Sequence, residues 1–159
     1  VVAYRRGDYR EAQMLQEEGL ALFRELRFKR GIAVALNDLG DVALGLQEYA
    51  RARQCYLEDL QLGVEMDSKW DIAWSFEGLA QVAQAQQQTA LATQLLSASQ
   101  FLFTAINFRW RPEDRKARDA RIALLRTQLG EQAFATAWER GCTMPLSDVI
   151  RLAQQQLPH

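Results

Sequence analysis

The apolar residues of this 159-residue chain recur at a step of 40 positions. One alanine position and one leucine position recur in three successive units, and several other positions recur in two. These residues are Ala12, Ala52, Ala92, Leu22, Leu62, Leu102, Tyr9, Tyr49, Leu39, Leu79, Trp70 and Trp110. A fixed period in this range is typical of stacked helical repeats, in which each unit buries its apolar face only against its neighbours. The step therefore predicts an all-α array, and Gly31–Trp70 is its best-patterned unit.

Helical spacing of apolar residues, interrupted by short polar breaks, predicts a succession of helices. Proline is absent before Pro112 and no segment alternates with a period of two, so no strand is expected. The short connections favour antiparallel packing of successive helices. Lys29, Arg30 and Gly31 are predicted to close the first helix, since basic residues and glycine suit a helix C-terminus. The predicted helices span about residues 9–28, 32–46, 48–66, 70–86, 89–106, 112–129, 131–140 and 146–155.

The composition is that of a soluble globular protein, with a formal net charge of −1. This charge gives the whole chain no attraction to nucleic acid or to an anionic membrane. No apolar run approaches the roughly 20 residues that a membrane span needs. Cys55 and Cys142 are too few for a disulfide framework, so we expect a reduced, cytoplasmic setting. Val1–Arg6 resembles the end of a helix and no Met precedes it, from which we expect a piece of a longer protein.

The second and third units resemble the tetratricopeptide repeat family. The residues that carry the resemblance are Leu36, Leu39, Gly40, Ala43, Tyr49, Ala52 and Tyr56, followed by Phe76, Leu79, Ala80, Ala83, Ala92 and Leu96. The period exceeds the roughly 34 residues of the basic motif, and is similar to the extended form in bacterial regulators resembling the maltose-responsive transcription activator. The resemblance implies a right-handed α-α superhelix. Small residues at Gly40 and Ala52 would let paired helices approach closely.

The repeat is no longer recognisable after Phe108. Residues 1–108 are thus predicted to form the repeats, with a truncated first unit, and residues 109–159 to form capping helices of the same domain. The segment LGEQAFATAWERGCTMPLSDVIRLA resembles the closing part of large bacterial signalling ATPases and LuxR-like regulators. Its apolar residues could cover the face that a repeat array leaves exposed. They are Phe134, Trp138, Val149, Ile150 and Leu152.

Catalytic chemistry has little basis in the sequence. The only histidine is His159, the last residue, and neither a phosphate-binding loop nor a dinucleotide-binding glycine motif is present. We therefore expect a protein that is not an enzyme, with no cofactor and no metal site.

The tetratricopeptide resemblance implies that the first helix of each pair lines a concave groove. Carried onto this chain, the groove residues are Val34, Asn37, Asp41, Leu44, Trp74, Glu77, Gln81 and Gln84. Their mixture of an aromatic ring, amides and carboxylates suits an extended peptide. We therefore predict a protein-interaction or sensor module of a larger bacterial signalling or transcription-regulatory protein, binding a peptide, an effector or that protein's own ATPase domain. The alternative is that these are solvated polar positions, with Trp74 half-buried against the next helix.

Two further interpretations remain open. Arg111, Arg115 and Arg118 belong to a basic cluster that could contact phosphate groups, but interspersed acidic residues favour a solvated, locally paired face. The truncated first unit leaves an apolar end that a second copy of the chain could cover.

Trp70 and Trp110 occupy equivalent repeat positions, which favours a structural role at the junctions between pairs.

Overall fold

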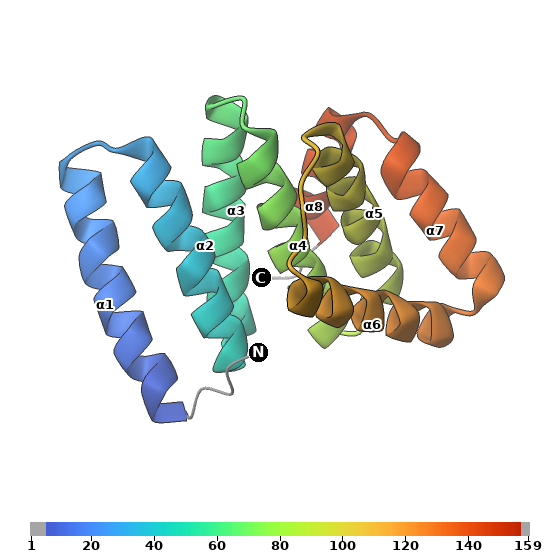
Figure 1. Ribbon diagram of the computed structural model, residues 1–159, viewed down its shortest axis with the longest axis horizontal. Helices are drawn as coiled ribbons and strands as arrows, with labels where there is room; N and C mark the ends of the chain where they lie inside the picture. Colours follow the sequence, from blue (N-terminus) through green and yellow to red (C-terminus); the bar gives the residue numbers. More distant parts are fainter. Residues whose placement is uncertain (1–5, 157–159) are drawn as a thin grey trace.

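The computed structural model describes residues 6–156, and these residues form helices only (Figure 1). The helices are α1 (Arg6–Glu25), α2 (Lys29–Gly45), α3 (Tyr49–Glu65), α4 (Lys69–Ala85), α5 (Thr89–Ala105), α6 (Pro112–Leu129), α7 (Glu131–Thr143) and α8 (Leu146–Gln156). Helices α1 to α5 stand side by side in chain order, each antiparallel to the one before it. The predicted all-α solenoid is confirmed. The prediction made for Val1–Arg6 lies outside the described residues, apart from Arg6 itself.

A regular joint sets the spacing of the array. Helices α2, α3, α4 and α5 each contain 17 residues, and a residue with left-handed backbone follows each of the first five helices. These residues are Arg27, Gln47, Asp67, Gln87 and Asn107, with φ between 49° and 62°. At each joint two crossed backbone hydrogen bonds satisfy the last carbonyls of the helix, the pattern of a Schellman motif. The structural unit is therefore one helix and its joint, repeated every 20 residues.

The joints correct one sequence prediction. Lys29, Arg30 and Gly31 do not close the first helix but form the first turn of α2, because α1 already ends at Glu25. The reversal occurs at Arg27, a residue type that does not announce a left-handed turn in the way that glycine does.

The core lies between the paired helices and is continuous from α2 to α8. Tyr56 of α3 is completely buried at its centre, and a Cβ atom on Gly40 or Gly78 would overlap the tyrosine ring. The two glycines therefore allow α2 and α4 to close on either side of one aromatic side chain. The Tyr56 hydroxyl donates a hydrogen bond of 2.6 Å to Oδ1 of Asp41.

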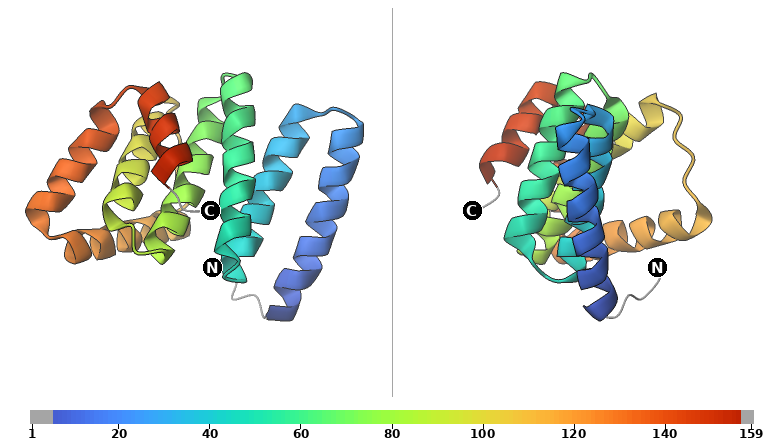
Figure 2. Two further views of the ribbon diagram at one scale, coloured as in Figure 1. Left: turned by 180° about the vertical axis from the view of Figure 1, so that it is seen from behind. Right: turned by 90° about the vertical axis from the view of Figure 1, so that its left-hand side faces the viewer.

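The regular spacing ends at Pro112. The 20-residue rhythm would start a helix at Arg109, but Arg111 is extended (φ −66°, ψ 145°), as the residue before a proline prefers, and α6 begins only at Pro112. Helix α6 then runs crosswise to the array, below α4 and α5 in Figure 1 and projecting from one side of it in Figure 2. The position beside α5 that the next helix of the array would occupy is taken by α7, which packs along α5.

Helices α7 and α8 close one end of the array. Gly141 lets the α7 backbone approach the carbonyl of Gln94 on α5, and α8 lies against α3 and α5. All five apolar residues predicted to cap the array pack against its core, with Phe134 and Val149 fully buried. Among residues 6–156, nothing covers the opposite end: on α1, Leu22 is 59 % exposed, whereas the equivalent Leu102 on α5 is 4 % exposed. No helix within residues 6–156 is both long and apolar enough to cross a bilayer.

Candidate functional site

The residues predicted to line the groove are gathered on one side of the array. All eight line three neighbouring hollows formed by α2, α4 and α6, with smaller contributions from α1 and α3. The hollows share Asn37, Asp41, Trp74 and Gln81, so they form one continuous surface, which we call the groove. Val34, Asp41, Leu44, Trp74, Gln81 and Gln84 keep part or much of their surface open to solvent.

Glu77 differs from the other seven because it is buried beneath α6. Nε of Arg118 lies 2.7 Å from Glu77 Oε1, and Nη1 of Arg121 lies 3.3 Å from Oε2. The Ser99 hydroxyl donates a third hydrogen bond of 2.6 Å to Oε1. Arg118 also donates to the side chain of Gln100 and to the carbonyl of Leu96 on α5. This polar junction fastens α6 to α4 and α5, and Glu77 belongs to the interior rather than to the groove surface.

The three arginines of the proposed phosphate contact do not form one surface. Arg118 is buried in the Glu77 junction and only 5 % exposed. Arg111 is paired with Asp114 at 2.9 Å, and Arg115 lies 3.9 Å from Asp119. The structure therefore brings these basic residues to acidic partners within the chain, two of them on the surface and Arg118 in the interior.

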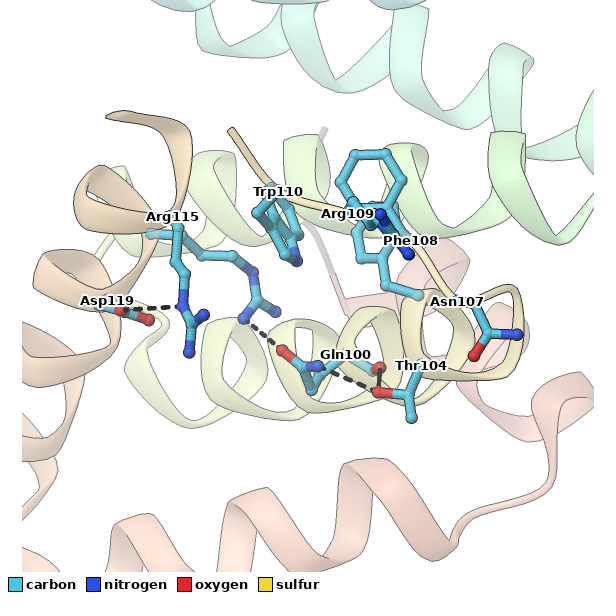
Figure 3. Close-up of a pocket in the computed structure, with 10 residues that line it drawn as sticks. Gln100, Thr104, Asn107, Phe108, Arg109, Trp110, Arg115 and Asp119 are labelled. Atoms are coloured by element: carbon cyan, nitrogen blue, oxygen red, sulfur yellow. Dashed lines mark hydrogen bonds and ion pairs between the residues drawn. The ribbon is translucent and has the colours of Figure 1, made fainter. Parts of the chain in front are cut away.

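A hollow larger than each of the three that form the groove lies outside it, between the end of α5 and the start of α6 (Figure 3). Its volume is about 720 Å³, and Phe108, Trp110, Arg115 and Gln100 are among its lining residues. In Figure 3 Arg115 turns towards Asp119. Arg118, which also lines the hollow, donates a hydrogen bond of 2.7 Å to the side chain of Gln100. Two of the three arginines that line this hollow thus have partners, whereas Arg109 forms no ion pair with any of residues 6–156.

Five aromatic rings meet between the groove and this hollow. Trp74 is the hub, with its ring centroid 5.1 Å from that of Phe103 and 5.6 Å from that of Trp110. Trp70 joins through Phe108 at 5.2 Å and through Trp74 at 6.0 Å, in edge-to-face geometry. Trp70 and Trp110 thus meet at the junction of α4, α5 and the segment leading to α6. Trp70 nevertheless remains 40 % exposed at the rim of the groove.

The part of the groove between α2 and α4 is lined by four aspartates and by no basic residue. This part, which we call the acidic hollow, has a volume of about 290 Å³. Its lining residues are Ala33, Val34, Asn37, Asp38, Asp41, Asp59, Trp70, Asp71 and Trp74. Asp59 of α3 lies at its floor and is 1 % exposed.

Asp59 is incompletely satisfied. Its Oδ2 accepts hydrogen bonds from Asn37 Nδ2 at 2.9 Å and from the Ser75 hydroxyl at 2.8 Å, while its Oδ1 is buried with no hydrogen-bond partner. Burial raises the pKa of this carboxyl to about 7, against which the two hydrogen bonds act. Loss of hydration also raises the pKa values of Asp38 and Asp41. Asp71 alone has a cation, the guanidinium of Arg30 at 2.9 Å.

Sequence reasoning missed the buried polar residues behind the groove. Asp59 of α3 was not predicted, nor were Asp71 and Ser75 of α4, which complete its surroundings. A signal was present: Asp59 lies on the buried stripe of α3, at helical spacing from Tyr56 and Gly63. An acidic residue on such a stripe indicates a buried polar centre. Among residues 6–156, no group of three or more histidine, cysteine, aspartate or glutamate side chains is arranged to hold a metal ion.

Comparison with known proteins supports the repeat assignment. The family model of the tetratricopeptide repeat matches residues 1–62, which covers α1, α2 and most of α3. No curated protein and no solved structure matches the chain.

Proposed function

We propose that this chain is a protein-interaction module that binds an extended peptide segment along the groove. Tetratricopeptide repeats generally mediate protein–protein interaction and are typically non-catalytic. The observation that carries the proposal is the gathering of partly exposed aromatic, amide and carboxylate side chains from α2 and α4 into one continuous hollow surface. Such a surface can hold a peptide backbone through hydrogen bonds and its side chains in separate hollows.

The proposal includes the setting that the resemblance of residues 129–153 implies. In that setting the chain serves as a sensor or interaction region of a larger bacterial signalling or transcription-regulatory protein in the cytoplasm. A small inducer and the ATPase domain of the same protein are then the alternative occupants of the groove. Phosphate binding receives no support from Arg118, because its guanidinium is buried on Glu77.

A matched pair of valine substitutions tests the groove. Val34 is 47 % exposed at the groove on α2, and Val64 is 41 % exposed on α3, outside the three hollows. Peptides selected from a random display library on the unmodified chain should lose binding to Val34→Arg and keep it with Val64→Arg, as measured by fluorescence anisotropy. Circular dichroism would show that both variants keep their helices. Failure to select any peptide, or equal binding by the two variants, would contradict the proposal.

Self-association is a second candidate that one observation favours. The outer face of α1 exposes Leu15 and Leu22, at 63 % and 59 %, and Leu26 directly after the helix is 74 % exposed. Leu15 and Leu22 are seven residues apart and lie on one face of the helix, where a second copy of the chain could cover them. Light scattering on concentrated protein distinguishes the cases, since a monomer at every concentration would remove this candidate.

A further inference from the structure

The second and third repeats each bury one carboxylate at the same place between their two helices. A step of 40 residues relates Asn37 to Glu77 on the first helices, and Asp59 to Ser99 on the second helices. Asn37 donates to Asp59 at 2.9 Å, and Ser99 donates to Glu77 at 2.6 Å. The acid has changed helix between the two repeats, but the bonded pair of positions is the same.

The two buried acids differ in their cations. Glu77 receives Arg118 and Arg121 from α6. The residues 40 positions earlier are Gly78 and Gln81 on α4, so the next helix along the chain brings no positive charge to Asp59. In the third repeat, arginine side chains thus neutralise the buried acid. For the acid of the second repeat, the equivalent positions carry no basic side chain.

The charges around the acidic hollow are predominantly negative. Asp38 and Asp41 face it from α2, Asp59 from α3 and Asp71 from α4. The nearby cations are Arg30, which is paired with Asp71, and Arg121 of α6, which acts on Asp41 but forms its ion pair with Glu77. Within residues 6–156, Asp38, Asp41 and Asp59 take part in no ion pair. A buried carboxylate without a cation is costly, and Asp59 also leaves Oδ1 without a hydrogen bond.

We propose that the acidic hollow binds the basic side chain, lysine or arginine, of a peptide lying in the groove. The cationic end meets the carboxylates of Asp38, Asp41 and Asp59, and the aliphatic stem lies against Val34 and the indole rings of Trp70 and Trp74. A volume of about 290 Å³ is below the roughly 300–1,000 Å³ of pockets for whole small molecules, and suits one side chain. This inference rests on the proposed function, since it specifies which peptides the groove selects.

Defined peptides test the inference directly. The probe is the acetylated and amidated pentapeptide Gly-Ser-Lys-Ser-Gly, with arginine, norleucine or glutamate in place of lysine in three matched peptides. Binding is followed by the indole N–H resonances of Trp70 and Trp74, assigned with single Trp→Phe variants. The lysine and arginine peptides should shift these resonances, and their binding should weaken when salt is added. The norleucine and glutamate peptides should not bind.

Matched aspartate substitutions locate the charge. Asp59→Asn keeps an oxygen that can accept from Asn37 and Ser75, and should weaken binding of the lysine peptide about tenfold. Asp148→Asn on α8 removes the same charge far from the hollow and should leave binding unchanged. Because the pKa of Asp59 is raised to about 7, the affinity of the unmodified chain should increase from pH 5.5 to pH 8. That increase should be smaller in Asp59→Asn.

The outcomes separate this inference from the proposed function. Binding of the norleucine peptide as tight as that of the lysine peptide would overturn the inference and leave peptide binding by the groove intact. Absence of binding by every pentapeptide would also overturn it, while peptides selected by display could still show that the groove binds other sequences. Butylammonium binding as tightly as the lysine peptide would identify a small-amine site instead, and competition by Ca²⁺ would identify a cation site; either result overturns the inference.

Discussion

The junction of α4, α5 and α6 and the acidic hollow between α2, α3 and α4 are two versions of one arrangement. In both, an acid is buried at the contact of a first and a second helix, and the partner helix donates a hydrogen bond to it. At the junction, two arginines complete the coordination of Glu77. In the hollow, Asp59 has two neutral donors and no cation.

The difference shows how the same position can serve structure in one repeat and leave a binding opportunity in the next. An acid that is paired inside the chain holds α6 in place, because breaking the pair would leave a charge buried alone. The unpaired acid Asp59 is held only by neutral donors from α2 and α4, and its proton is retained at higher pH because burial disfavours the charged form. Pairing by α6 therefore closes the groove at one end, and the absence of pairing leaves a charged hollow at the other.

The largest effect is expected from removing the paired acid. Glu77→Ala leaves Arg118 buried with no counter-charge, and should lower the free energy of unfolding by about 3–5 kcal/mol. Because the pair fastens α6, trypsin should also cleave more rapidly within Pro112–Leu129, which is rich in arginine. Urea denaturation and timed proteolysis measure the two effects.

The control for Glu77→Ala is an exposed ion pair on α6, the helix that Glu77 fastens. Asp119 lies 3.9 Å from Arg115, and both side chains are mostly in solvent. Asp119→Ala should change the stability by less than about 0.5 kcal/mol and leave the cleavage pattern unaltered. Equal effects of the two substitutions would show that the buried pair does not hold α6.

The unpaired acid Asp59 should make the stability of the chain depend on pH. The pKa of Asp59 is about 7 in the folded chain and near its ordinary value of 3.8 in the unfolded chain. Between these values the folded state keeps a proton that the unfolded state has lost, so stability falls as the pH rises through 7. This group alone should cost roughly 2–3 kcal/mol between pH 5 and pH 8. Asp38 and Asp41, whose pKa values are also raised, act in the same direction.

Asp59→Asn removes the titrating group and should flatten this part of the pH profile. The stability of the variant relative to that of the unmodified chain should be greater at pH 8 than at pH 5. Urea denaturation at both pH values measures the difference. Parallel stability profiles for the two chains would mean that Asp59 does not carry an unpaired charge at neutral pH.

The sequence predicted the array, its helices and the cap because these depend on periodic apolar residues. Pro112 was correctly predicted to begin a helix, since proline suits a first turn and disfavours helix in the residue before it. All eight predicted residues lie on the groove side of the array, because the face of a helix follows from its spacing, but Glu77 is buried there beneath α6. Their binding role stays a prediction.

The buried polar centres were beyond that reasoning. Glu77 was assigned to the groove surface because its position on α4 is that of a first-helix residue, and nothing local indicates that α6 covers it. Arg118 was counted with the exposed basic residues for the same reason. The crosswise course of α6 depends on contacts made about 40 residues away, which no periodicity encodes. The breaks near Gln47, Asp67 and Gln87 were predicted, but their left-handed backbone was not, since glutamine and aspartate take the place where glycine is usual.

The smallest expected effect concerns the backbone frame that the two regions share. Gln47 and Gln87 are related by 40 residues and have left-handed backbone with φ of 62° and 61°. Residues other than glycine are strained in the left-handed conformation, because their Cβ atom crowds the backbone. Gln47→Gly and Gln87→Gly should therefore each stabilise the chain by about 0.5–1 kcal/mol. Thermal denaturation compares the two variants.

The same substitution within a helix provides the control. Gln54 is exposed to solvent on α3, away from both ends of the helix. Gln54→Gly should destabilise the chain by about 0.5–1 kcal/mol, because glycine loses more backbone entropy than other residues when a helix forms. Equal gains at Gln47 and Gln87, beside a loss at Gln54, would show that the two repeats share one backbone. Their different chemistry would then come from the cations that reach their buried acids. A gain at one joint and a loss at the other would mean that the repeats differ in backbone strain as well.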